Sequence, residues 1–129
     1  MIDGIEAIYQ QIAESIQEAI AEEWSTAMME AIFYNNSSTY FGEYTRKADG
    51  KLRDFGTTRS GERAFREARR RFRDAGNKPW GRATFELFPD GKFIMKLGYD
   101  GCDENGDTVF DEVEELRRHE ERRNRLTSA

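Results

Sequence analysis

Apolar residues recur along the chain at two spacings, and each spacing predicts one kind of secondary structure. From Ile5 to Ile20, isoleucines stand three or four positions apart, which places one apolar stripe on an amphipathic helix within residues 2–22. The next run, EEWSTAMMEAIFY, is richer in β-branched and aromatic residues, and its side chains fall into two alternating sets. This period of two predicts a strand within residues 22–34.

Turn residues divide the following segment into two further strands. The tetrapeptide NNSS (35–38) has turn chemistry and precedes an expected strand, TYFGEYT (39–45). An Asp-Gly turn within KADGK (47–51) then leads to a short third strand, LRDF (52–55). Three strands joined by tight turns predict an antiparallel meander.

The helical period returns over TTRSGERAFREARRRFRDAG, residues 57–76. Thr58 or Ser60 is suited to cap the beginning of this helix, and Gly76 stands where a left-handed C-terminal cap belongs. The expected buried stripe comprises Phe65, Ala68, Phe72 and Ala75.

Two alternating runs, RATFELF (82–88) and KFIMKLGY (92–99), are joined by PDG, which is a strong hairpin signal. A final helix is expected from Val109 to Leu126. The order helix, three strands, helix, two strands, helix predicts an α+β fold, in which helices pack on an antiparallel sheet of about five strands. No internal repeat or long linker divides the chain, so we expect a single domain across residues 1–129.

Charge and composition narrow the classes of partner. The chain has 129 residues, a formal net charge of −5 and 35% charged residues. Phosphate-rich partners would be repelled, so we expect neither direct nucleic-acid binding nor attachment to an anionic membrane. No apolar run approaches the roughly 18–20 residues that span a bilayer, and the first residues lack the pattern of a secretory signal. With Cys102 as the only cysteine there is no disulfide framework, and a cytoplasmic location is expected.

The densest charge lies in YDGCDENGDTVFDEVEE, residues 99–115, which holds eight carboxylates. An EF-hand calcium loop with Gly106 at its sixth position would have Gly101 at its first, where a side-chain oxygen is required. The preceding segment also has the pattern of a strand rather than a helix, so calcium binding is not favoured. Capping of the final helix by Asp107 or Thr108, with further acids in its first turns, explains only part of the run.

The chain offers no recognisable catalytic or metal-binding constellation. His119 is the only histidine and is far in sequence from Cys102, the only thiol. No nucleophile motif accompanies His119, and no glycine-rich phosphate loop is present. We therefore expect no enzyme activity, no bound metal and no cofactor.

Arginines recur at spacings of three and four on one face of the second expected helix. The set comprises Arg59, Arg63, Arg66, Arg70 and Arg73. Such a row fits phosphate binding, a solvated helix face with internal ion pairs, or pairing with acids elsewhere in the fold. The negative net charge disfavours phosphate binding, and the other two roles remain open.

Two tyrosines form a second candidate contact surface. Tyr40 and Tyr44 lie on one face of the second expected strand, with Gly42 between them. Tyrosine is favoured at protein interfaces, so this face is a candidate if no helix covers it.

Five segments of the chain occur in a characteristic order: IEAIYQQIAESI, EEWSTA, FREARRRFRDAGNKPW, TFELFPDGKF and YD. In this order they resemble the YezG-like family of bacterial immunity proteins, or antitoxins, over about residues 5–100. Trp24, Pro79 and Trp80 are the most specific matches, and Pro79 and Trp80 look like determinants of the fold rather than of a site. The second helix is richer in arginine than the family pattern, and the last 30 residues follow no part of it.

The resemblance implies a cytosolic protein that binds and neutralises the toxin domain of a cognate secreted or contact-delivered toxin, typically a nuclease. A nuclease presents a basic cleft to its substrate, and carboxylates that mimic the charge of the substrate can fill that cleft. We therefore predict an acidic decoy surface that comprises Tyr99, Asp100, Asp103, Glu104, Asp107, Asp111 and Glu112. Complementary fields would also speed the encounter of the two proteins.

A small acidic secretion chaperone is the alternative function. Its likeness to this chain lies in the order of elements and the negative charge alone. Such a chaperone would bind an unfolded effector segment across exposed apolar patches, whereas an immunity protein would bind a folded toxin domain and abolish its activity.

Overall fold

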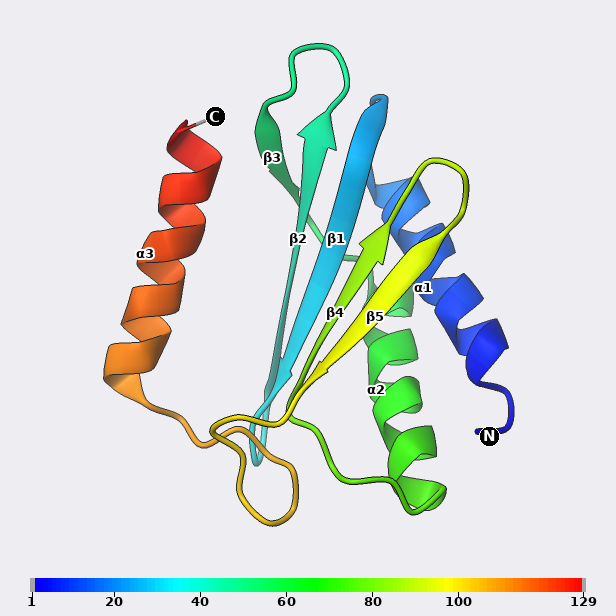
Figure 1. Ribbon diagram of the computed structural model, residues 1–129, viewed down its shortest axis with the longest axis vertical. Helices are drawn as coiled ribbons and strands as arrows, with labels where there is room; N and C mark the ends of the chain where they lie inside the picture. The colour runs from blue at the N-terminus through cyan, green and yellow to red at the C-terminus, as the bar shows by residue number, and fades with distance from the viewer. Residues whose placement is uncertain (1, 129) are drawn as a thin grey trace.

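The predicted strands join into one antiparallel sheet in the computed structural model, which describes residues 2–128 (Figure 1). The elements are α1 (Ile5–Ala19), β1 (Trp24–Phe33), β2 (Ser38–Arg46), β3 (Leu52–Phe55), α2 (Arg59–Asp74), β4 (Arg82–Leu87), β5 (Phe93–Gly98) and α3 (Glu112–Ser128). The strand order is β3-β2-β1-β4-β5, so the β1-β2-β3 meander and the β4-β5 hairpin meet where β1 pairs with β4. The predicted α+β class and the predicted order of elements are both confirmed.

The core lies between the sheet and the pair α1 and α2, which cover the same face (Figure 1). Alternate residues of β1 point into this layer, and they include Ala27, Met29, Ala31 and Phe33. Phe65 of α2 and Phe85 of β4 are fully buried there with Trp80. Burial of these large side chains supplies the main hydrophobic stabilisation of the domain.

Local signals set the ends of α2. The hydroxyl of Thr58 accepts a hydrogen bond from the Gly61 amide at 3.2 Å, so Thr58 is the capping residue of the two predicted. Gly76 has a φ of 79°, as expected for a left-handed cap. Phe65 and Ala68 are buried as predicted, but Ala75 is exposed because the helix ends at Asp74.

The third helix lies on the opposite face of the sheet (Figure 1) and docks through charged groups. Glu43 of β2 is buried, and its Oε1 lies 2.9 Å from Arg125 Nη2 and 3.3 Å from Arg122 Nε. The Arg122 guanidinium also stacks on the Phe41 ring at 4.5 Å from its centroid. None of the helices within residues 2–128 is long and apolar enough to cross a membrane.

A glycine in β2 permits close packing at the short edge strand. A Cβ atom at Gly42 would lie 2.2 Å from Cζ of Phe55. We predict that Gly42→Ala lowers the free energy of unfolding by about 1–3 kcal/mol, because the ring has to move out of its packed position. Urea denaturation measures the change.

Gly56→Ala is the matched control, since a Cβ atom there would meet nothing within 4 Å. It should change the free energy of unfolding by less than ~1 kcal/mol. Equal effects of the two substitutions would contradict the packing role of Gly42.

Candidate functional site

The acidic stretch folds into a tight loop that its own side chains stabilise. The Asp103 carboxylate accepts hydrogen bonds from the backbone amides of Asn105 at 2.9 Å and Asp107 at 3.1 Å. Gly106 completes the turn with a φ of 82°, and a Cβ atom there would lie 2.1 Å from Cβ of Pro79. Asp103 therefore shapes the loop.

Arg69 of α2 ties this loop to the body of the protein. Its guanidinium donates to the Trp80 carbonyl at 2.8 Å, the Gly106 carbonyl at 2.7 Å and Asp107 Oδ1 at 2.9 Å. It also lies over the Phe33 ring, 4.8 Å from the centroid. The side chains of Arg69 and Asp107 are only 13% and 17% exposed. Asp107 is thus neutralised within the molecule, which makes it a structural residue rather than a free charge.

Thr108 then fixes the chain at the point where it passes to the face of the sheet that α3 covers. Its amide donates to the Phe33 carbonyl at 2.7 Å, and its hydroxyl donates to the Gly81 carbonyl at 3.0 Å. The residue is buried, and it forms an isolated parallel bridge with Tyr34 beyond the end of β1. The position of the chain before α3 is therefore fixed at both β1 and β4.

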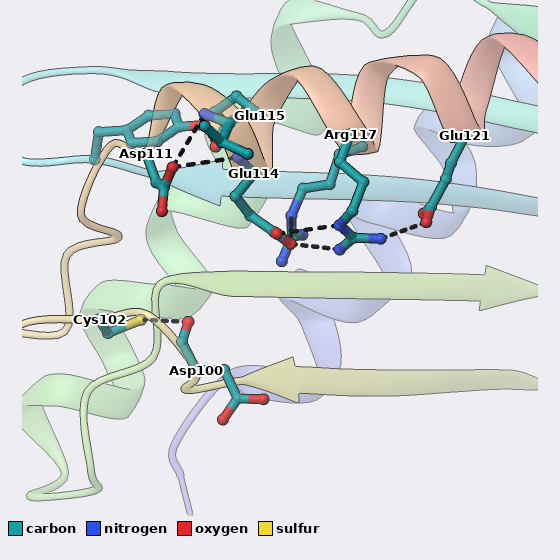
Figure 2. Close-up of polar contacts among 10 residues, drawn as sticks. Asp100, Cys102, Asp111, Glu114, Glu115, Arg117 and Glu121 are labelled. Atoms are coloured by element: carbon teal, nitrogen blue, oxygen red, sulfur yellow. Dashed lines mark hydrogen bonds and ion pairs between the residues drawn. The ribbon is translucent and has the colours of Figure 1, made fainter.

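The beginning of α3 is set by Asp111, not by Asp107 or Thr108 as predicted. The Asp111 carboxylate accepts hydrogen bonds from the amides of Val113 at 3.0 Å and Glu114 at 3.2 Å (Figure 2). The helix accordingly begins at Glu112, three residues later than expected. The two residues considered for capping are instead held by Arg69 and by the sheet, which leaves the cap to the next suitable side chain.

Further contacts hold the first turns of α3. Tyr34 donates a hydrogen bond to Glu115 Oε1 at 2.6 Å, and burial together with this bond raises the pKa of the Tyr34 phenol. Hydrogen bonds from Arg117 hold the pKa of Glu114 at about 2, so this carboxylate is charged at neutral pH (Figure 2). Acidic groups in a first turn are also favoured by the helix dipole.

Four apolar side chains of this region point into solvent. We call them the apolar cluster: Val109, Phe110, Val113 and Leu116, which are 58%, 67%, 78% and 58% exposed. Val113 and Leu116 are three residues apart in α3 and so share one side of the helix, and Phe110 immediately precedes the cap residue Asp111. A small soluble domain normally directs such residues inward, so this grouping marks a candidate contact surface.

Exposed carboxylates surround the apolar cluster in sequence. Asp100, Glu104 and Glu112 are exposed, and no hydrogen bond or ion pair within residues 2–128 engages their carboxylates. Tyr99 is 36% exposed, with the Lys78 ammonium 5.0 Å from its ring centroid. Of the seven predicted site residues, these four are available to a partner.

The remaining three predicted residues have structural roles. Asp103, Asp107 and Asp111 shape the loop, bind Arg69 and cap α3 respectively. The predicted acidic surface does not include the apolar cluster, although the sequence carries a signal for it. This signal is the presence of four apolar residues, at positions 109, 110, 113 and 116, inside an otherwise charged segment.

The second candidate surface is covered. Tyr44 is buried in the core, and Tyr40 packs on Phe33 and Phe65 at ring-centroid distances of 6.1 and 6.5 Å. The face that carries Tyr40 and Tyr44 is the one beneath α1 and α2. The condition for a tyrosine contact surface is therefore not met.

The arginine row of α2 is exposed on the outside of the molecule. Arg70 forms ion pairs with Glu67 and with Asp74, the latter at 3.0 Å. Arg66 donates a hydrogen bond to the Tyr40 hydroxyl at 3.3 Å. These contacts agree with internal pairing on a solvated helix face, and the arginine that does bind the acidic stretch, Arg69, lies outside the predicted row.

His119 and Cys102, the residues considered for metal binding and catalysis, lie in different surroundings. Within residues 2–128 no group of three or more His, Cys, Asp or Glu side chains could hold a metal ion. His119 lines a groove of about 340 Å³ between α3 and the sheet, together with Phe41, Arg118 and Arg122. The Cys102 thiol makes a weak 3.8 Å contact to the Asp100 carbonyl and lies far in sequence from His119 (Figure 2).

Replacement of Arg69 tests the role of its guanidinium. We predict that Arg69→Met lowers the free energy of unfolding by about 2–4 kcal/mol, because Asp107 and two carbonyls lose their shielded partner. Amide hydrogen exchange at Thr108 should accelerate, since its bond to Phe33 depends on the position of the loop.

Arg70→Met is the control for this experiment. Its ion pairs are exposed, so the loss should be below ~1 kcal/mol and exchange at Thr108 should not change. If both variants behave alike, Arg69 does not anchor the loop.

Comparison with protein families and curated sequences found no match to this chain. No protein-family model matches the chain, and no curated protein sequence matches it. The likeness to the YezG-like family therefore remains a prediction from the motifs quoted above.

Proposed function

We propose that the protein is an immunity-type inhibitor, which binds a basic toxin domain, a nuclease in the first instance, and blocks its activity. The proposal rests on the apolar cluster, which is exposed at the beginning of α3, and on the exposed carboxylates of Asp100, Glu104 and Glu112, which lie near it in sequence. No reaction by the protein itself is required, because inhibition needs only a surface that stays bound.

The two parts of this surface have different physical roles. Apolar side chains that leave water on binding supply most of the affinity, and a central aromatic residue such as Phe110 is a typical anchor. Carboxylates at the rim contribute less to affinity, but they attract a basic partner and orient it. The combination fits a positively charged, folded domain better than a neutral one.

A secretion chaperone is a second candidate, since exposed apolar side chains are also what that function needs. Phe93 and Ile94 add exposed apolar groups at β5, away from α3 in sequence. A chaperone would use such groups to hold an unfolded segment of its effector. The two functions differ in the state of the partner, which a binding experiment resolves.

The experiment is co-expression with the toxin-like product of a reading frame adjacent to the gene. Host survival and co-purification are scored for the unchanged chain and for surface variants. Survival that depends on this chain, together with a stable complex, supports the inhibitor. Host survival both with and without this chain, together with binding of the chain to an unfolded non-toxic segment, supports the chaperone.

Substitutions in the apolar cluster should have the largest effect. We predict that Phe110→Ser combined with Val113→Ser weakens binding of the toxin domain roughly hundredfold or more, mainly through faster dissociation. Surface plasmon resonance measures both rates. The positions are solvent-exposed, so the free protein should keep its stability.

Charge reversal tests the carboxylates separately. Asp100→Lys, Glu104→Lys and Glu112→Lys together should slow association about tenfold or more at low salt and weaken its dependence on salt. The matched control reverses three exposed acids of α1, Glu6, Glu14 and Glu18, with the same change in net charge. Equal slowing in both variants would show that net charge, rather than this surface, attracts the partner.

A further inference from the structure

The strand β5 forms one edge of the sheet and has few of the features that prevent an edge strand from pairing with another strand. Natural edge strands are commonly short or carry prolines, bulges or several charges that discourage pairing. β5 is six residues long, FIMKLG, with Lys96 as its only charge, and its register with β4 is unbroken. Phe93 and Ile94 are 42% and 45% exposed. The opposite edge, β3, has only four residues.

The hairpin geometry identifies which backbone groups of β5 face outward. Phe88 and Lys92 face each other across the turn, with the Phe88 amide donating to the Lys92 carbonyl at 2.9 Å. In an antiparallel ladder the inward-pointing groups recur at every second residue, so those of Ile94 and Lys96 also point to β4. The amides and carbonyls of Phe93, Met95 and Leu97 therefore point away from the sheet.

These outward groups are self-complementary. When β5 pairs with β5 of a second copy about a twofold axis at Met95, all three residues fall in hydrogen-bonded positions. On the side of α1 and α2, Phe93 then lies opposite Leu97 of the second copy. On the other side, Ile94 lies opposite Lys96 of the second copy, so no like charges face each other directly. The Lys96 ammonium already has a partner in its own chain, Glu86 Oε1 at 2.8 Å.

We propose that the protein forms a homodimer through antiparallel pairing of the two β5 strands, which makes one continuous sheet across both copies. The pairing covers Phe93, whose ring stacks on Phe85 at a centroid distance of 4.9 Å and extends the core to the edge. An isologous contact of this kind closes on itself and does not propagate into fibres.

The dimer leaves the proposed toxin-binding surface free. The acidic loop and the beginning of α3 follow the C-terminal end of β5. Antiparallel pairing sets the two C-terminal ends at opposite ends of the shared strand pair. Each copy therefore presents its own apolar cluster, and two toxin domains can bind to one dimer.

Charge substitutions at Ile94 and Lys96, on the face of the sheet opposite α1 and α2, test the register of the pairing. The protein is measured alone, with no toxin present. In the Ile94→Lys variant the new lysine of each copy faces Lys96 of the other copy, so the dimer contains two repulsive lysine pairs. This substitution should raise the dimer dissociation constant about tenfold. Within the monomer the new lysine faces Glu86, so the fold should be kept. Analytical ultracentrifugation over a concentration series measures the constant.

The double variant Ile94→Lys with Lys96→Glu places opposite charges across the twofold axis and should restore or exceed the original affinity. Asn36→Lys, which adds the same charge in an exposed turn, should leave dimerisation unchanged. A monomer at all concentrations up to the millimolar range would overturn the proposal. So would a dimer that ignores Ile94→Lys, or one that Phe110→Ser abolishes, because the contact would then lie elsewhere.

Discussion

The position of the acidic loop before α3 depends on the hydrogen bonds and the ion pair that the Arg69 guanidinium forms. The guanidinium joins α2 to the Trp80 carbonyl and to the loop at Gly106 and Asp107, in a position largely shielded from water. A shielded cation is stable only when several oxygens surround it, so the loop cannot leave without a large cost in free energy. Together with the loop bonds of Asp103, this side chain helps to order a highly acidic segment, whose charges repel one another, as the connection between β5 and α3.

The order of that connection determines what α3 presents to solvent. Thr108 fixes the chain against Phe33 and Gly81, and Asp111 caps the helix immediately afterwards. The helix then lies on the sheet through its arginines, with buried Glu43 as the anchor. Because charged groups occupy the side facing the sheet, the apolar residues Val113 and Leu116 face outward. An arrangement of this kind has a clear physical purpose only when another molecule covers the apolar side.

Much of the fold could be predicted from local sequence, whereas little of the site could. Periodicity located each helix and strand, and Thr58, Gly76 and the PDG turn acted as their side chains suggest. The roles of Asp103 and Asp107 could not be read locally. Arg69 lies 38 residues before Asp107, and nothing in the spacing of either residue indicates the contact. The sequence therefore predicts all seven residues as a contact surface, although three of them have structural roles. Likewise, the face of the sheet that carries Tyr40 and Tyr44 is covered by helices, which depends on the strand order. In that order β1 pairs with β4, although α2 separates the two strands in the chain.

We propose that the beginning of α3 is a protein-binding surface. The most direct measurement is hydrogen exchange, followed by mass spectrometry, on the free protein and on its complex with the co-expressed toxin domain. We expect slowed exchange across residues 109–116 in the complex, with the exposed face of α2 unchanged. Slowed exchange confined to α2, with residues 109–116 exchanging as in the free protein, would contradict the proposal.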